Sequence, residues 1–297
     1  LDQKIALIKE KAVCDAGLYF GTTGDNWSEF EKVYGKAMGI KVYLNQTTGN
    51  FLVNTDILDM VYQNWKSTQP ILTHSEADTV GEVIAAVRKY GKQTHVCHIS
   101  SIDELEPILK AKEEGLPVTC GVCPHHLFLT EDDVPRLGSY GLMKPSLKSK
   151  KDLEFLWKHI KDIDTVESDH APHTKEEKES EKPPFGVPGL ETTLPLLLTA
   201  VKEGRLEMDD ITRMCYTNPK KILHLSSTQN AEITVELDNY YELKDEDIVS
   251  RCGWTPYRGM KVVGKVTSAS IRGTKAYENG TVLAKPGDGK LIIPVTI

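Results

Sequence analysis

The sequence has few cysteines for its length, and their spacing argues against a disulfide framework. Its 297 residues contain only Cys14, Cys97, Cys120, Cys123, Cys215 and Cys252. A chain this long can bury a sizeable core without covalent cross-links. Cys120 and Cys123 form a CxxC pair, but no second pair follows at zinc-ribbon spacing, and residues three apart on a strand face opposite sides. We therefore expect six reduced thiols and no structural zinc at this pair.

Long apolar runs and excess positive charge are also absent. No apolar run approaches the roughly 18 residues of a membrane-spanning helix. The formal net charge of -7 at pH 7 argues against a surface for nucleic acid or anionic membranes. The first residues, Leu1 to Lys4, show neither an initiator methionine nor a signal-peptide pattern. We expect a cytoplasmic protein without nucleic-acid or membrane partners, and a chain that continues upstream of Leu1.

Short apolar segments alternate with segments of helical spacing through the first three quarters of the chain. Apolar residues that recur every three or four positions predict helices at 1–13, 27–38, 55–65, 80–90, 102–114, 150–161, 190–203 and 208–223. Short apolar runs between them predict strands at 14–21, 39–44, 70–74, 94–98, 117–123 and 163–169. Such alternation is typical of βα units around a parallel sheet.

The number of strands predicts which parallel fold this is. A (β/α)8 barrel requires eight strands, so the six strands expected here leave two βα units to lie upstream of Leu1, on the order of 60 residues at ~30 per unit. A doubly wound open sheet is the competing fold, but the segment Gly21 to Gly24 lacks the third glycine of a phosphate-binding turn. We predict an α/β protein with six of the eight strands of a TIM-type barrel within residues 1–225.

The pattern changes in residues 226–297. Alternating apolar and polar residues, with a period of two, occur at 233–237, 260–266, 269–271 and 281–283. Turn sequences around Asn279-Gly280 and Asp288-Gly289 separate these runs. We expect a small β-sandwich-like module at the C-terminus.

Ionisable side chains occur at or near the ends of four expected strands: Lys41, His74, His98 and Asp169. Each alone is more often an ion-pair member or a hydrogen-bonded core residue, but in a parallel barrel all these ends lie on one face. Imidazole and carboxylate groups suit Zn²⁺, and a lysine carboxylated by CO₂ could bridge two metal ions. Two ions need more nitrogen ligands than two histidines, and the sequence contains no His-x-His.

Six further segments carry a family resemblance. They are Lys41 to Asn45 (KVYLN), Cys97 to Ser100 (CHIS), Pro124 to Leu127 (PHHL), Ser168 to His173 (SDHAPH), Phe185 to Thr192 (FGVPGLET) and Trp254 to Tyr257 (WTPY). The chain resembles dihydroorotases of the amidohydrolase superfamily, in the form found within multifunctional eukaryotic pyrimidine-synthesis proteins. The DHAPH and GVPGLET segments together distinguish this group from hydantoinases and allantoinases.

The resemblance implies a binuclear zinc site with carboxylated Lys41 as the bridge. His74 and His98 would bind the second metal, whereas Asp169 would bind the first and act as general base and acid. It implies substrate contacts from Thr47, Lys144, His173, Pro188 and Gly189. The implied reaction is the reversible cyclisation of N-carbamoyl-L-aspartate to L-dihydroorotate. It also implies a homodimer and covalent fusion to carbamoyl-phosphate synthetase and aspartate transcarbamoylase domains.

Several departures from the family pattern keep a second hypothesis open. The family's His-x-His-x-Arg strand would lie upstream of Leu1. Lys144 stands where the family has an arginine, and lysine cannot offer paired donors to a carboxylate. Thr48 replaces an aromatic residue, and Glu167 replaces a small one and should face into the barrel. The chain is thus an active zinc dihydroorotase, or an inactive dihydroorotase-like domain with a structural or assembly role. A relative that binds cytoskeletal partners is a third alternative, which Lys41 disfavours.

Overall fold

A six-stranded parallel sheet organises the first part of the molecule. The computed structural model describes residues 1–49, 51–226 and 230–295. The strands follow one another across the sheet in chain order, and each neighbouring pair is parallel. They are β1 (Phe20–Gly21), β2 (Ile40–Tyr43), β3 (Ile71–His74), β4 (Thr94–Ile99), β5 (Val118–Val122) and β6 (Thr165–Val166). Parallel strands in sequential order are the arrangement of six consecutive units of a (β/α)8 barrel, as the sequence predicted.

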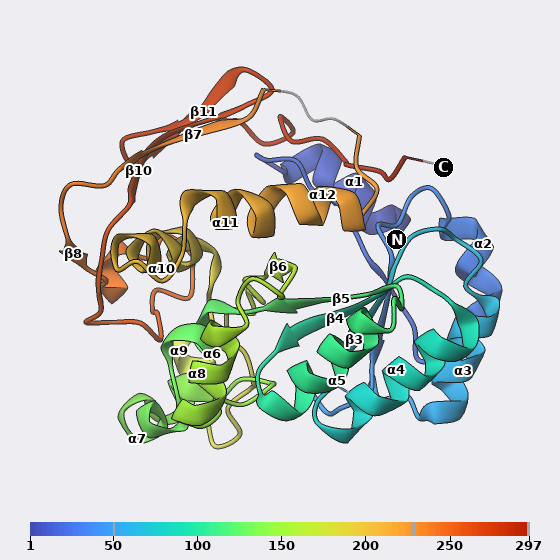
Figure 1. Cartoon of the computed structure of the whole chain (residues 1–297). Helices are drawn as coiled ribbons and strands as arrows, with labels where there is room; N and C mark the ends of the chain where they lie inside the picture. The colour runs from blue at the N-terminus through green and yellow to red at the C-terminus, as the bar shows by residue number, and fades with distance from the viewer. Residues whose placement is uncertain (50, 227–229, 296–297) are drawn as a thin grey trace.

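Helices follow the strands and cover the outer side of the sheet. In Figure 1, α3, α4 and α5 lie side by side along it, α11 and α12 cross above β6, and α10 lies to the left of β6. The α-helices of this part are α1 (Asp2–Lys11), α2 (Phe30–Val33), α3 (Thr55–Asn64), α4 (Asp78–Tyr90), α5 (Ile102–Glu113), α6 (Pro124–Phe128), α7 (Val134–Leu137), α8 (Lys150–Lys158), α9 (Lys175–Lys178), α10 (Leu190–Lys202), α11 (Met208–Thr212) and α12 (Asn218–Ile222). Short 3₁₀ turns are η1 (Trp27–Glu29), η2 (Glu131–Asp133) and η3 (Gly138–Gly141).

Some predicted elements are shorter than the sequence indicated. The helix expected at 27–38 consists of η1 and α2 only, because the chain turns at Gly35, whose φ is +72°. The helix expected at 208–223 is continuous but includes a π-helical turn, η4 (Arg213–Thr217), between α11 and α12. Strands β1 and β6 have two residues each. Both stand at the ends of the strand order, so within the described residues each has a sheet partner on one side only.

The main core lies between the sheet and its helices. Trp65 is almost completely buried at the end of α3, and its indole nitrogen donates to the carbonyl of Gln69 at 2.9 Å. Its ring meets Phe30 and Tyr34 edge to face, with centroid distances of 5.6 and 5.0 Å. Aromatic pairs of this geometry add to the free energy gained by area burial. These contacts connect α2 to α3 behind strand β2.

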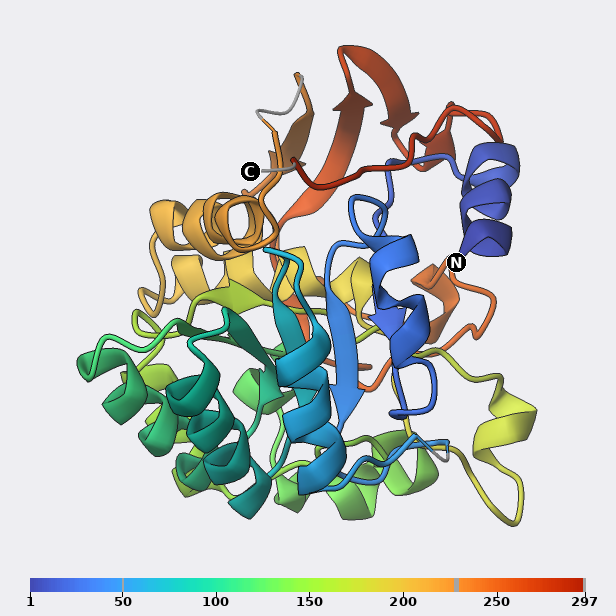
Figure 2. The ribbon, with the colours of Figure 1, turned by 90° about the vertical axis from the view of Figure 1, so that its right-hand side faces the viewer.

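The C-terminal part is antiparallel. Strands β7 (Glu232–Glu236), β10 (Lys265–Ile271), β11 (Thr274–Glu278) and β12 (Thr281–Val282) form one sheet in the order β12-β11-β10-β7. Figure 2 shows these strands standing above the parallel sheet. The run expected at 260–266 is divided by Gly264, whose φ is +92°. It contributes to β10 and to β9 (Lys261–Val262), which pairs with β8 (Tyr241–Glu242).

The segment between β7 and β10 packs against the barrel. Trp254 and Tyr257 are buried in a second apolar cluster that also contains Leu129 and Leu196 from the barrel. The 3₁₀ turn η5 (Asp245–Asp247) lies within the same segment. The β-sandwich-like character of residues 226–297 and the boundary at residue 226 stay predictions. None of the helices in the described ranges is long and apolar enough to span a bilayer.

The aromatic contacts of Trp65 predict a large loss of stability on truncation. We expect Trp65→Ala to lower the free energy of unfolding by about 3–5 kcal/mol, because it removes a fully buried ring and leaves a cavity. Trp27→Ala is the matched control: its side chain is 56% exposed, so we expect a change within about 0.5 kcal/mol. Urea denaturation measures both. Equal losses for the two variants would contradict this account of the core.

Candidate active site

A cavity of about 590 Å³ opens where the parallel strands end. Lys41 on β2, His74 on β3, His98 on β4 and Asp169 after β6 all line it. These are the four residues predicted as metal ligands. They come from positions up to 128 apart in the chain, and the parallel sheet brings them together because its strands end at one edge.

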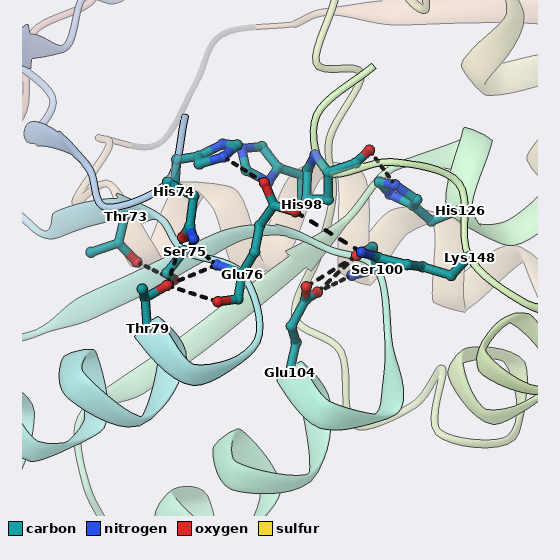
Figure 3. Close-up of polar contacts among 12 residues, drawn as sticks. Thr73, His74, Ser75, Glu76, Thr79, His98, Ser100, Glu104, His126 and Lys148 are labelled. Atoms are coloured by element: carbon teal, nitrogen blue, oxygen red, sulfur yellow. Dashed lines mark hydrogen bonds and ion pairs between the residues drawn. The ribbon is translucent and has the colours of Figure 1, made fainter. Parts of the chain in front are cut away.

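The two histidines point a ring nitrogen at each other. His74 Nδ1 lies 3.1 Å from His98 Nε2 (Figure 3). The other nitrogen of His74, Nε2, lies 3.2 Å from Glu76 Oε1. Burial would raise the pKa of Glu76, but the hydrogen bond and charge of His74, together with Lys144 and Lys148, outweigh it and lower the pKa, so this group is a carboxylate and only accepts. His74 therefore carries its proton on Nε2 and turns the lone pair of Nδ1 toward His98.

This geometry fits a shared metal ion. Two nitrogens that each lie 2.0–2.1 Å from a tetrahedral zinc ion are about 3.4 Å apart, close to the observed separation. Metal-bound histidines commonly donate their second ring nitrogen to a carboxylate, as His74 does to Glu76. His98 Nδ1 is buried and has no hydrogen-bond partner in the described part of the chain. Burial lowers the pKa of His98 well below its usual value, so this ring is neutral, the form that binds metal.

The backbone at His98 is held in an unusual conformation. His98 has a φ of +42° and lies in an irregularity of the β4–β5 ladder. Its amide donates to Glu167 Oε2 at 3.0 Å. A positive φ is costly for a residue with a side chain and persists only where its surroundings impose it. Glu167 is one such contact, since it connects the end of β4 to the end of β6.

Glu167 has a partner below the cavity. Its Oε1 lies 2.5 Å from His95 Nε2, and His95 Nδ1 contacts Thr119 Oγ1 at 2.8 Å. Burial would raise the pKa of Glu167, but His95 and then Lys41 outweigh it and lower the pKa. A methyl group added to Gly121 would overlap this carboxylate, so the glycine on β5 leaves the space that Glu167 occupies. A carboxylate that is largely removed from water needs a partner, and His95 provides it.

Lys41 lies between groups that favour its positive charge. Burial lowers the pKa of its ammonium, but Cys97, Tyr43 and Glu167 raise it, and the net direction is upward. The ammonium lies 5.0 Å from the centroid of the Tyr43 ring. CO₂ reacts only with a neutral amine, so the ammonium of Lys41 has to lose a proton before the side chain can be carboxylated.

Asp169 has the properties of a group that exchanges protons. It follows β6 and adopts a φ of +39°. Removal from water raises the pKa of Asp169; Lys41 opposes this, Glu167 adds to it, and the net direction is upward. A raised pKa brings a carboxyl group closer to the range in which it can both accept and return a proton.

A polar network supports the histidine pair from outside (Figure 3). The amide of Glu76 donates to Asn45 Oδ1 at 2.7 Å, and Thr79 Oγ1 donates to the same atom at 2.6 Å. Lys148 Nζ lies 3.9 Å from Glu76 Oε2. These contacts fix the carboxylate that orients His74. Glu76 was not among the residues predicted for the site, although its spacing of two from His74 on one extended segment was a signal for it.

The loops above the strand ends bring polar and aromatic groups to the cavity. Thr47, Lys144 and His173, which were predicted to contact substrate, all line it. His173 Nε2 lies 3.1 Å from the carbonyl of Phe185, and the hydroxyl of Thr48 donates to that carbonyl at 2.9 Å. Lys144 Nζ lies 5.4 Å from the centroid of the Phe185 ring. Thr48 and Phe185 thus connect the loop after β2 with the loop after β6.

Pro188 and Gly189 are buried beside the cavity and do not line it. The amide of Gly189 donates to His170 Nδ1 at 3.2 Å, so this donor is already engaged. Their role as substrate contacts stays a prediction.

Sequence reasoning also missed aromatic residues that line the cavity. Tyr43 could have been found, because it is two residues after Lys41 on one strand, whereas Phe51 lies in a loop that carries no periodic signal.

Comparison with known proteins identifies the family. No family model matches the chain. It is 39% identical over 292 residues to the multifunctional protein CAD of Squalus acanthias, covering 98% of this chain but only 13% of that protein. It is 33% identical over 303 residues to the dihydroorotase of Pyrococcus furiosus, covering 96% of this chain and 70% of that enzyme.

Solved structures give the same result for the fold. The L-hydantoinase (dihydropyrimidinase) from Arthrobacter aurescens superposes with a TM-score of 0.93 at 25% identity, over 98% of this chain and 76% of that one. An inactive dihydroorotase-like domain of the Chaetomium thermophilum CAD-like multifunctional protein superposes with a TM-score of 0.79 at 25% identity, over 95% and 79%. The predicted TIM-type fold is confirmed. The chain belongs to the dihydroorotase family of the amidohydrolase superfamily.

Proposed function

We propose that the chain is a zinc-dependent dihydroorotase domain that interconverts N-carbamoyl-L-aspartate and L-dihydroorotate. The observation that carries the proposal is the convergence of Lys41, His74, His98 and Asp169 on one cavity, with the two imidazole nitrogens 3.1 Å apart. His74 and His98 are 1% and 5% exposed, and buried polar groups that face each other are costly unless they are paired or bound to metal.

In this proposal His74 and His98 would hold one zinc ion, and Asp169 would hold a second, with carboxylated Lys41 as a further oxygen ligand. Zinc would polarise the amide carbonyl of the substrate and favour ionisation of the attacking water. Zinc generally takes four ligands, so the ion at Asp169 requires donors beyond Lys41 and Asp169. His74 and His98 are the two proposed ligands whose ring nitrogens already lie at a separation that suits one zinc ion.

Asp169 performs the proton transfers. In the hydrolytic direction it accepts a proton from the attacking water as the new C–O bond forms at the ring carbonyl. It then gives that proton to the amide nitrogen as the C–N bond breaks. The new carboxyl group of N-carbamoyl-L-aspartate loses the second proton of the water to solvent and becomes a carboxylate. Lys144, His173 and Thr47 face the same cavity and would hold the carboxylate of the substrate. A lysine at 144 attracts this carboxylate as a point charge, without the paired donors of arginine.

A second candidate function is an inactive dihydroorotase-like domain with a structural or assembly role. The observation that favours it is the pair of Glu167 and His95, which adds a carboxylate directly below the proposed metal centre. The similarity to the inactive domain from Chaetomium thermophilum supports it as well.

For either function we propose a cytoplasmic homodimer fused to carbamoyl-phosphate synthetase and aspartate transcarbamoylase domains, by analogy with the multifunctional relatives.

The first prediction concerns Asp169. We expect Asp169→Asn to lower kcat for dihydroorotate hydrolysis about 10²–10⁴-fold, because the amide cannot accept the proton of water. Asp162→Asn is the matched control, since its carboxylate is 54% exposed and pairs with His159 outside the cavity. Hydrolysis is followed by the loss of dihydroorotate absorbance, and zinc content by elemental analysis of the same samples. A folded, metal-free and inactive wild-type protein would exclude the enzyme and leave the structural role.

The second prediction concerns Lys144. We expect Lys144→Arg to lower KM about tenfold with little change in kcat, because arginine offers two parallel donors to a substrate carboxylate. Lys150→Arg serves as the control, as Lys150 is exposed on α8, where it pairs with Glu154. Steady-state kinetics separate the two parameters. An unchanged KM would show that Lys144 does not contact the carboxylate.

A further inference from the structure

A second group of potential metal ligands lies at the start of α6, outside the cavity. Cys123 ends the segment that follows β5, and His125 and His126 belong to the helix. Each of the three offers one ligand atom, and these atoms all lie within 4.8 Å of one another. The side chains are completely enclosed, with exposed fractions of 0%, 1% and 2%. None of them lines the 590 Å³ cavity.

The two histidines of this group lack the hydrogen bonds that burial normally requires. Neither ring nitrogen of His125 has a partner among the described residues, and neither does Nδ1 of His126. A buried polar atom without a partner costs about 1–3 kcal/mol, and most such atoms in native proteins are paired. Three unpaired nitrogens in two adjacent, fully buried rings therefore indicate a ligand that they bind in common.

The hydrogen bond of His126 Nε2 indicates which of its ring nitrogens can bind a ligand. His126 Nε2 lies 3.1 Å from the carbonyl oxygen of Pro145, which can only accept, so Nε2 carries the proton (Figure 3). The lone pair of His126 is consequently on Nδ1, the buried nitrogen without a partner. Donation of one ring nitrogen to a carbonyl is how metal-bound histidines are commonly oriented. Burial lowers the pKa of His126 to about 4 and that of His125 well below its usual value, so both rings are neutral.

We propose that Cys123, His125 and His126 bind one thiophilic metal ion, Zn²⁺, at a site separate from the candidate active site. Thiolate and imidazole are the preferred ligands of zinc. Burial raises the pKa of the Cys123 thiol well above its usual value, so the sulfur is protonated until the ion binds. On binding, the S–H bond breaks, the proton leaves to solvent and the sulfur bonds to the metal. Three protein ligands leave the fourth tetrahedral position to a water molecule or a carbonyl.

The site would stabilise a particular connection in the fold. Cys123 follows β5, and His126 is hydrogen-bonded to the carbonyl of Pro145. One ion bound by both residues would therefore connect the β5–α6 turn, through His126, to the segment that contains Pro145. An ion that binds only the folded state stabilises it by mass action. The proposal does not depend on dihydroorotase activity, because it holds for an active or an inactive barrel. It also excludes Cys120, the first cysteine of the CxxC pair, which is not part of the group.

Cobalt substitution of the full chain tests this site through its sulfur ligand. After removal of bound metal with a chelator and reloading with Co²⁺, we expect a thiolate-to-cobalt charge-transfer absorption in the near ultraviolet. Cys123→Ser should abolish it. Cys120→Ser is the matched control, as it removes a buried thiol three residues away and should leave the absorption intact. Cys97→Ser should also leave it intact, which separates this site from the candidate active site that Cys97 lines.

Zinc content and thermal unfolding provide the second measurement. We expect Cys123→Ser and His125→Asn each to bind about one zinc ion fewer per chain than Cys120→Ser, and to lose the rise in Tm that zinc gives the wild type. If Cys123→Ser does not fold, His125→Asn carries the test, because it leaves the thiol in place. A wild-type chain without the cobalt–sulfur absorption, or variants with unchanged zinc content, would overturn the proposal.

Discussion

The candidate active site depends on one constraint, the parallel register of strands β2, β3 and β4. Parallel pairing aligns Tyr43 with His74 and Lys41 with Leu72, so the strands end together at one edge of the sheet. Lys41, His74 and His98 can meet only because of this alignment. A slip of one residue in any strand would turn its side chain to the opposite face of the sheet. The backbone hydrogen bonds of the sheet thus determine the chemistry that the cavity can perform.

Glu167 lines the cavity with a carboxylate that is only partly exposed, which would be costly alone, but it accepts from His95 and from the amide of His98. Gly121 provides the space for this carboxylate. Glu167 therefore stabilises the positive φ of His98 and at the same time changes the electrostatics around Lys41 and Asp169. The same side chain supports the geometry of the site and alters its electrostatics.

Much of the fold followed from local patterns, and the differences have physical causes. Six strands and their parallel order could be predicted because each strand is apolar and each is followed by a helix. Their lengths could not, since β1 and β6 have a single neighbour within the described ranges. Strand β11, from Thr274 to Glu278, was missed because charged and small residues interrupt its alternation. The antiparallel pairing with β10 forms it nevertheless, because backbone hydrogen bonds do not require a regular apolar pattern.

By itself, the sequence determined the family, the barrel-type fold and the identity of the residues at the strand ends, because motifs and periodicity are local properties of the chain. Only the tertiary structure decided how these residues face one another. It placed ring nitrogens of His74 and His98 3.1 Å apart and paired Glu167 with His95, and among the described residues it left the ring nitrogens of His125 without partners. Distances between side chains from separate strands depend on register, backbone conformation and burial, and none of these can be read from sequence spacing.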